Sequence, residues 1–143
     1  MFERILLAVD GSDESREAIR TAIELARSGE GEILAVHVHA KDVGFQVTED
    51  VETRDEAALL LEAAVDIVRK ADVPVIGELR ASRADKVADE LIAAADAYAA
   101  DCIVVGSRGA GPLAEILIGS VANQVVHRAH CPIIVTRRAA VAA

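Results

Sequence analysis

Short aliphatic runs alternate along this chain with longer segments of helical periodicity, and this alternation limits its fold more than any other feature. Within each run, consecutive residues are apolar, which is typical of strands buried on both faces of a parallel sheet. Strands that alternate with helices predict right-handed crossovers and helices on both faces of the sheet. We therefore predict a doubly wound α/β fold. The runs expected to form strands are residues 5–9, 33–38, 73–76, 102–105 and 132–136.

Capping residues mark where the helices between these strands should begin. Ser12 is followed by two acids, as at a helix N-terminus. Thr53 and Glu56 have the spacing of a capping box, and Ser82 with Asp85 repeats the pattern of a cap followed three residues later by an acid. Apolar residues at helical spacing follow each signal. The expected helices are residues 13–28, 54–71, 84–98 and 120–129.

Length and composition fit a single domain. The chain has 143 residues, with no Trp, one Tyr and two Phe, so Ala, Val, Ile and Leu must fill its core. Small aliphatic side chains suit helices packed closely on a parallel sheet. We expect one domain over residues 1–143, of which residues 137–143 form a loose tail.

Charge and hydropathy argue against some cellular locations and some classes of partner. The net charge is −9 and no basic cluster is present, which argues against a nucleic-acid partner. No apolar run approaches the roughly 18 residues of a membrane span, and no secretory signal is readable at the N-terminus. We expect a soluble cytoplasmic protein with no membrane partner, in which Cys102 and Cys131 are reduced and structural.

A glycine-rich segment follows the expected strand 102–105. It covers residues 106–118, longer than the about two to six residues usual between a strand and a helix in such folds, and Gly119 and Ser120 open the next helix. Glycine lets the backbone approach a ligand, and free N–H groups at a helix start attract anions. The segment is therefore a candidate phosphate site. Turn glycines with Ser120 as an ordinary cap are the structural alternative.

The spacing of these glycines resembles a family signature. Gly106 and Gly109, followed after nine residues by Gly119 and Ser120, resemble the G-2x-G-9x-G-S/T pattern of ATP-binding universal stress proteins. The resemblance covers nearly the whole chain, including residues 5–12 and 131–135. It implies a Rossmann-like, HUP-type three-layer fold with a five-stranded parallel sheet in the order 3-2-1-4-5. In that order the first and fourth strands meet at a topological switch point, where open α/β sheets bind ligands.

The resemblance implies that ATP, alone or with Mg²⁺, lies between the first and fourth strands. Asp10 would accept a hydrogen bond from ribose or adenine, or reach a phosphate-bound Mg²⁺, and its structural alternative is a cap for the first helix. Arg108 would pair with a phosphate. The matching positions are Ala8, Val9, Asp10 and Val38 around adenine and ribose, Gly106, Arg108, Gly109, Gly119, Ser120 and Val121 around the phosphates, and Val105 beside them.

The leading functional hypothesis is a stress-response binding or signalling module whose surface depends on ATP occupancy. The P-loop motif is absent, and Lys41, Lys70 and Lys86 lie far in sequence from the glycines. No residue is placed by sequence to orient an attacking water, so we assign no catalytic residue. A slow Mg-dependent ATP hydrolase or phosphate-transfer enzyme and a nucleotide-free dimeric adaptor are the alternatives. FMN binding is disfavoured because its phosphate loop should follow the first strand.

The last expected strand is also a candidate interface. If it forms an edge of the sheet, Ile133, Ile134 and Val135 present unpaired backbone on an apolar strand, which proteins usually cover. We predict a homodimer that pairs through this strand, as the family resemblance also implies.

The histidines suggest no metal site. His37 and His39 alternate on the second strand, so they should face one side together near the mouth of the crevice. His127, His130 and Cys131 are close in sequence, but their spacing matches no closed zinc pattern. We expect structural roles for them.

Overall fold

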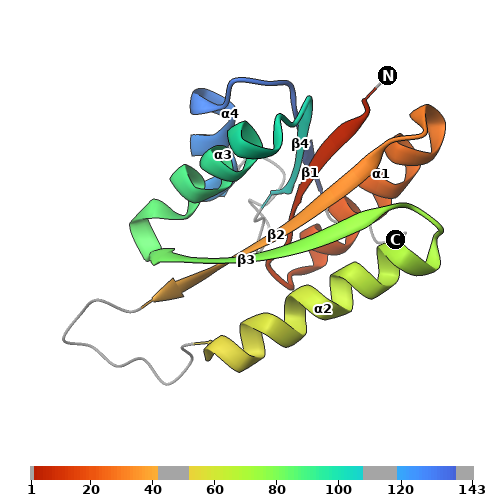
Figure 1. Ribbon diagram of the computed structural model, residues 1–143. Helices are drawn as coiled ribbons and strands as arrows, with labels where there is room; N and C mark the ends of the chain where they lie inside the picture. Colours follow the sequence, from red (N-terminus) through yellow and green to blue (C-terminus); the bar gives the residue numbers. More distant parts are fainter. Residues whose placement is uncertain (1, 42–51, 108–118, 138–143) are drawn as a thin grey trace, which may run out of the picture.

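The computed structural model describes residues 2–41, 52–107 and 119–137, which form three layers with a sheet between two layers of helices (Figure 1). The sheet of this part of the chain has five parallel strands in the order β3-β2-β1-β4-β5, so the predicted fold class and strand order are confirmed. The strands are β1 (Arg4–Ala8), β2 (Glu32–Lys41), β3 (Val75–Arg83), β4 (Cys102–Gly106) and β5 (Ile133–Thr136). The helices are α1 (Asp13–Gly29), α2 (Arg54–Lys70), the 3₁₀ helix η1 (Ala84–Lys86), α3 (Val87–Tyr98) and α4 (Ser120–Arg128).

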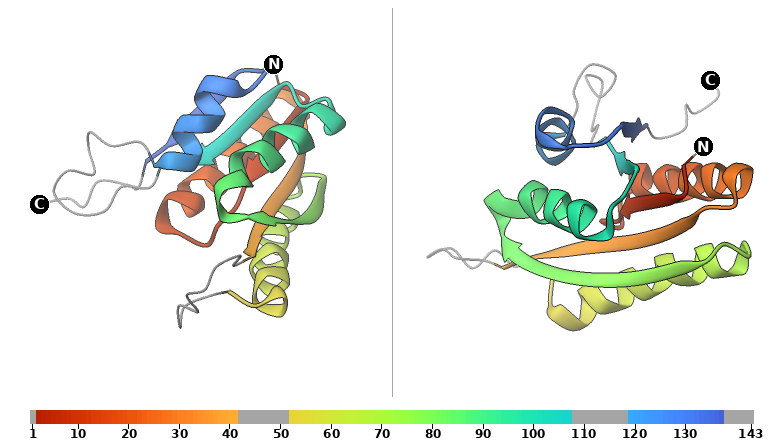
Figure 2. Two further views of the ribbon diagram at one scale, coloured as in Figure 1. Left: turned by 90° about the vertical axis from the view of Figure 1, so that its left-hand side faces the viewer. Right: turned by 45° about the horizontal axis from the view of Figure 1, so that its top comes forward.

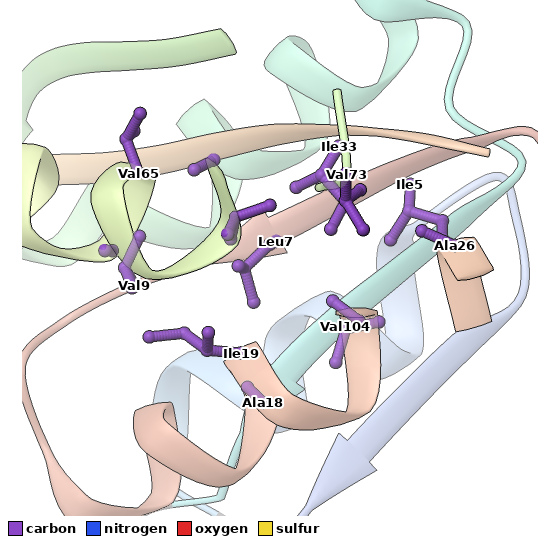
Figure 3. Packing of buried hydrophobic residues seen from close by; sticks show 14 of the residues in the cluster. Ile5, Leu7, Val9, Ala18, Ile19, Ala26, Ile33, Val65, Val73 and Val104 are labelled. Atoms are coloured by element: carbon purple, nitrogen blue, oxygen red, sulfur yellow. The ribbon is translucent and has the colours of Figure 1, made fainter. Parts of the chain in front are cut away.

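The sheet separates two hydrophobic cores. Helices α1 and α2 cover one face, and α3 and α4 cover the other, as the views in Figure 2 show. Alternate residues of β1 therefore enter different cores, with Leu7 toward α1 and α2 and Leu6 toward α3 and α4. Figure 3 shows the first core, in which alanines such as Ala18 and Ala26 let the helix lie close to the strands. Small aliphatic side chains fill both cores, as the composition predicts.

Strand β1 lies at the switch point of the sheet. Its Ile5 is paired with Ile33 of β2 on one side and with Cys102 of β4 on the other. The chain leaves β1 for β2 on one side and later crosses to β4 on the other. The carboxyl ends of these strands therefore open onto a common space, as expected for a ligand crevice.

The first two helix starts agree with their predicted caps. The Ser12 hydroxyl accepts a hydrogen bond from Ser15 N, at 3.1 Å. The capping box of α2 is complete, because Thr53 Oγ1 accepts from Glu56 N and the Glu56 carboxylate accepts from Thr53 N.

The cap predicted for the third helix is wrong. Ser82 lies within β3, paired with Ala40, and its hydroxyl donates to the Arg83 carbonyl. The chain then passes through η1, and α3 begins at Val87 without a side-chain cap. Strand β2 runs to Lys41, beyond its expected end, and its pairing holds β3 extended to Arg83. Main-chain pairing has therefore overridden the local capping signal.

The two cysteines are free thiols that contribute to different cores. Cys102 is buried in the core beside α1 and α2, whereas Cys131 packs against the core beside α3 and α4. Burial raises the pKa of Cys102 to about 12 and raises that of Cys131 as well. Both are therefore neutral small apolar groups, as predicted. Of the tail expected over residues 137–143, residues 138–143 lie outside the described residues.

No helix in the described part of the chain combines the length and the apolarity that a membrane crossing requires.

Candidate functional site

A cavity of about 520 Å³ opens at the carboxyl ends of β1, β2 and β4. Its walls come from these strand ends, from η1 and the start of α3, from Glu52 just before α2, and from the first turn of α4. The lining residues are Ala8, Val9, Asp10, His37, Val38, Ala40, Lys41, Glu52, Ala84, Val87, Leu91, Val105, Gly106, Gly119, Ser120, Val121 and Ala122.

The cavity gathers the residues predicted for the nucleotide site from four separate parts of the chain. Every predicted position within the described residues lines it: Ala8, Val9, Asp10, Val38, Val105, Gly106, Gly119, Ser120 and Val121. Arg108 and Gly109 lie outside the described residues. Nucleotide contacts at all these positions stay a prediction.

Asp10 does not cap α1, since Ser12 has that role. The Asp10 carboxylate accepts hydrogen bonds from the main-chain N–H and the hydroxyl of Ser12, and Asp10 N donates to Ser15 Oγ at 3.2 Å. These bonds form a turn that fixes the carboxylate at the end of β1. An exposed acceptor held at this position can receive a hydrogen bond from a ligand hydroxyl.

The N-terminus of α4 presents main-chain donors to the cavity. Gly119 is the N-cap residue and provides no side chain, so the N-cap position itself makes no side-chain hydrogen bond to this helix. The first intrahelical bond runs from Asn123 N to Gly119 O at 2.9 Å. The N–H groups of Ser120, Val121 and Ala122 precede that bond and have no place in the helical ladder. Ser120 is thus the first helical residue, and its hydroxyl does not cap the helix.

Gly106 allows β4 to approach α1. A Cβ at Gly106 would lie 2.7 Å from Glu14 C and 2.8 Å from Glu14 O. The Glu14 carbonyl also accepts a hydrogen bond from Thr136 Oγ1 at 3.1 Å, which fixes this part of α1 against β5. The absence of a side chain at Gly106 is therefore required by helix packing, although the residue also borders the cavity.

Sequence reasoning missed Lys41 as a cavity residue. Lys41 lies far from the glycine-rich segment in sequence, but the extension of β2 brings it to the cavity that Gly106 and Gly119 also line. Nothing in the sequence indicated this, because the predicted second strand ended at Val38 and left Lys41 in a loop. Lys41 gives the cavity an exposed cation that is compatible with an anionic ligand.

A second group missed by sequence reasoning is the apolar wall of η1 and α3. Ala84, Val87 and Leu91 line the cavity together with Val38. In sequence they look like any helical core stripe, so only the fold identifies them as cavity residues.

His37 and His39 point to the same carboxylate, in agreement with the prediction that they face one side. His37 Nε2 lies 2.9 Å from Glu52 Oε1, and His39 Nδ1 lies 3.1 Å from Glu52 Oε2. His37 Nδ1 lies 2.6 Å from Val9 O. His37 and Glu52 line the cavity, and neither was among the predicted site residues.

A model of the Universal stress protein family matches residues 1–137. The chain belongs to the universal stress protein family. A relative from Methanocaldococcus jannaschii is 32% identical, covering 96% of this chain and 84% of its own. Universal stress protein YxiE of Bacillus subtilis is 28% identical, covering 96% of this chain and all of its own length.

Solved structures of universal stress proteins share this fold. One from Archaeoglobus fulgidus is 29% identical with a TM-score of 0.74, covering 95% of this chain and 94% of its own. A structure of the universal stress protein from the same organism in complex with dAMP is 28% identical with a TM-score of 0.70, covering 95% of this chain and 98% of its own. The family resemblance stated from the sequence is therefore confirmed.

Proposed function

We propose that this universal stress protein is a cytoplasmic stress-response module that binds an adenine nucleotide, with ATP as the expected ligand, alone or with Mg²⁺. The observation that carries the proposal is the N-terminus of α4, which begins at a glycine N-cap and borders the same cavity as Asp10. The dAMP complex of the relative from Archaeoglobus fulgidus supports an adenine nucleotide as the ligand class. Binding, without chemistry, is sufficient for this function.

The cavity offers different chemistry to each part of a nucleotide. Val38, Val87 and Leu91 form an apolar wall suited to a base. Asp10 is an acceptor for a sugar hydroxyl. The α4 N-terminus provides main-chain N–H groups and a positive dipole end for phosphate oxygens, and Lys41 adds a positive charge.

Thermal unfolding with and without nucleotide tests this function directly. A ligand at about a hundred times its Kd stabilises a protein by about 2.7 kcal/mol, which for a domain of this size corresponds to roughly 5–10 °C. We expect such a shift with ATP or dAMP. An unchanged Tm at millimolar concentrations of both nucleotides would contradict the proposal.

The Ser120→Glu variant tests the position of the phosphate. Ser120 is exposed in the first turn of α4, where a carboxylate favours the helix but repels a phosphate. The variant should keep its fold and lose the nucleotide-induced shift. Ser120→Gln is the matched control, because it has the same size without the charge and should retain most of the shift. Equal shifts in both variants would place the phosphate elsewhere.

We also propose that β5 pairs with its counterpart in a homodimer. The strand is an edge of the described sheet, and Ile133, Ile134 and Val135 are each only partly buried. Sedimentation velocity at micromolar concentration should show a dimer. Replacing Ile134 with Lys should produce a folded monomer, whereas a native protein that sediments only as a monomer would refute the proposed interface.

A further inference from the structure

The cavity wall contains a buried histidine, His37, whose two ring nitrogens both face oxygen atoms. His37 is only 5% exposed, and both of its ring nitrogens are within hydrogen-bonding distance of an oxygen. Nδ1 lies 2.6 Å from the Val9 carbonyl oxygen, and Nε2 lies 2.9 and 3.0 Å from the two carboxylate oxygens of Glu52. The ring therefore links the end of β1 to the residue that precedes the N-cap of α2.

These partners determine which nitrogens carry protons. A carbonyl oxygen only accepts, so Nδ1 of His37 must carry a hydrogen. An ionised carboxylate also only accepts, so a hydrogen bond to Glu52 requires a hydrogen on Nε2 as well. The pair therefore holds one proton more than a neutral imidazole beside a carboxylate. With that proton on the ring, His37 is an imidazolium that donates from Nδ1 to the Val9 carbonyl and from Nε2 to the Glu52 carboxylate.

His39 places no such demand on the cluster. Its Nδ1 lies 3.1 Å from Glu52 Oε2, and the neutral ring makes that contact with its single proton on Nδ1. Loss of a proton from His39 need not break the contact. The contact between His37 and Glu52 is the one that depends on charge.

The proton on His37 also sets the charge of the cavity wall. The charged or titratable side chains that line the cavity within the described residues are Asp10, His37, Lys41 and Glu52, and the lining residues of η1, α3 and α4 are uncharged. An imidazolium neutralises Glu52. A neutral His37 no longer neutralises Glu52 and turns the Nε2 lone pair toward the carboxylate, so the wall becomes more negative and this contact is lost.

We propose that His37 is a proton switch for the nucleotide cavity, which holds an anionic nucleotide more tightly when His37 is an imidazolium paired with Glu52. This inference rests on the proposed nucleotide-binding function and adds a form of regulation to it. A rise in pH through the titration of His37 removes one positive charge from the cavity wall. Nucleotide affinity then falls as pH rises, and the bound nucleotide favours the protonated ring by the same factor.

Histidine side-chain NMR tests the charge state without any ligand. The chain has four histidines, and the signals absent from the spectrum of a His37→Gln variant identify His37. At pH 6 we expect ¹⁵N shifts of two protonated nitrogens for His37, and one of these protons should be lost as the pH is raised to 9. A neutral His37 ring at pH 6 would overturn the proposal. Saturating dAMP should move the midpoint to higher pH, and an unmoved midpoint would equally overturn it.

The dependence of dAMP affinity on pH tests the coupling. Between pH 6 and 8.5 we expect the Kd of the native protein to rise about fivefold or more relative to a Glu52→Gln variant, the lower end of the range for coupled sites. In that variant the amide N–H can donate to a neutral His37, and its carbonyl can accept from His39, so the cluster forms without the extra proton. The comparison also cancels titration of the dAMP phosphate, which is common to both proteins.

Two further variants complete the test. His39→Gln should keep the dependence of the native protein, because His39 needs no extra proton. If Glu52→Gln does not fold, His37→Gln replaces it as the reference, since its amide can donate to Glu52 without titrating. A native-to-reference Kd ratio that stays constant with pH would overturn the switch. If neither dAMP nor ATP binds at any pH, the proposed nucleotide-binding function is refuted, and the proton switch that rests on it is refuted as well. The NMR titration does not depend on nucleotide binding and would still determine whether His37 is charged.

Discussion

A methyl group at Gly106 tests whether helix packing is what requires glycine at the end of β4. In a Gly106→Ala variant the new Cβ would lie 2.7 Å from Glu14 C, 2.8 Å from Glu14 O and 2.9 Å from Glu14 Cβ. Two of these atoms belong to the main chain of α1, which cannot rotate away as a side chain does. The helix is also held by the Ser12 cap and by the hydrogen bond from Thr136 to Glu14 O. Relief of the clash therefore requires α1 to move as a unit.

The magnitude follows from two opposing effects. Forcing an extra methyl into a packed site costs about 1–3 kcal/mol. The φ angle of Gly106 is outside the left-handed region, so alanine can adopt this backbone and regains about 0.4–1 kcal/mol by restricting the unfolded chain. We expect a net destabilisation of about 1–2 kcal/mol, or a fall in Tm of roughly 2–8 °C.

Urea unfolding followed by far-ultraviolet circular dichroism measures this change, and Gly77→Ala provides the matched control. A Cβ at Gly77 would meet Val65 Cγ2 at 2.8 Å and Leu61 Cγ at 3.5 Å, which are side-chain atoms able to shift. The free energy of unfolding of Gly77→Ala should remain within about 0.5 kcal/mol of the native value, because the backbone gain offsets a small repacking cost. A Gly106→Ala protein as stable as Gly77→Ala would refute the packing explanation.

Three other predictions follow from particular contacts. Thr53→Ala should lower the free energy of unfolding by about 1 kcal/mol because it removes the cap of α2. Ser82→Ala should change this free energy little, since Ser82 caps no helix. Equal losses of the two variants in urea unfolding would contradict this prediction. Burial and the hydrogen bond to Glu32 raise the pKa of Tyr98 to about 12, so absorbance of this single tyrosine should titrate near 12 in the folded protein and near 10 in urea. The raised value means that stability should decrease as pH rises from about 10 to 12, and a folded midpoint at 10 would show that the contact is absent in solution. Burial raises the pKa of the Cys102 thiol to about 12, so a disulfide reagent at pH 8 should modify it only after unfolding, and rapid modification in the native protein would contradict its burial.

Much of the fold could be predicted from the sequence because the strongest local signals agree with the tertiary structure. Consecutive apolar residues such as Ile5 to Val9 mark a strand with helices on both sides, and β1 has that environment. Thr53 and Glu56 predict the start of α2 because both halves of a capping box depend only on nearby atoms. Periodicity alone did not give the strand order. That order came from the family resemblance, because many doubly wound sheets share one alternation of strands and helices.

Residues that line the cavity could be predicted where they lie at strand ends or at the start of α4, and they were missed where their position depends on long-range pairing. Ser82 has the chemistry of a helix cap, but hydrogen bonds between β2 and β3 continue to Lys41 and Arg83. The same extension carries Lys41 to the cavity. One tertiary effect thus explains both the misplaced start of α3 and the overlooked cation.

The His37 cluster shows why residue types alone did not predict the chemistry of the cavity wall. Alternation on a strand correctly put His37 and His39 on one side, but it gave no partner for either ring. Glu52 is separated from both in sequence and reaches them only because α2 packs on the face of the sheet toward which they point. Two acceptors on opposite sides of one imidazole then require a proton that neither neighbour can supply. The charge of this wall is therefore a property of the assembled fold, and neither His37 nor Glu52 belongs to the glycine signature.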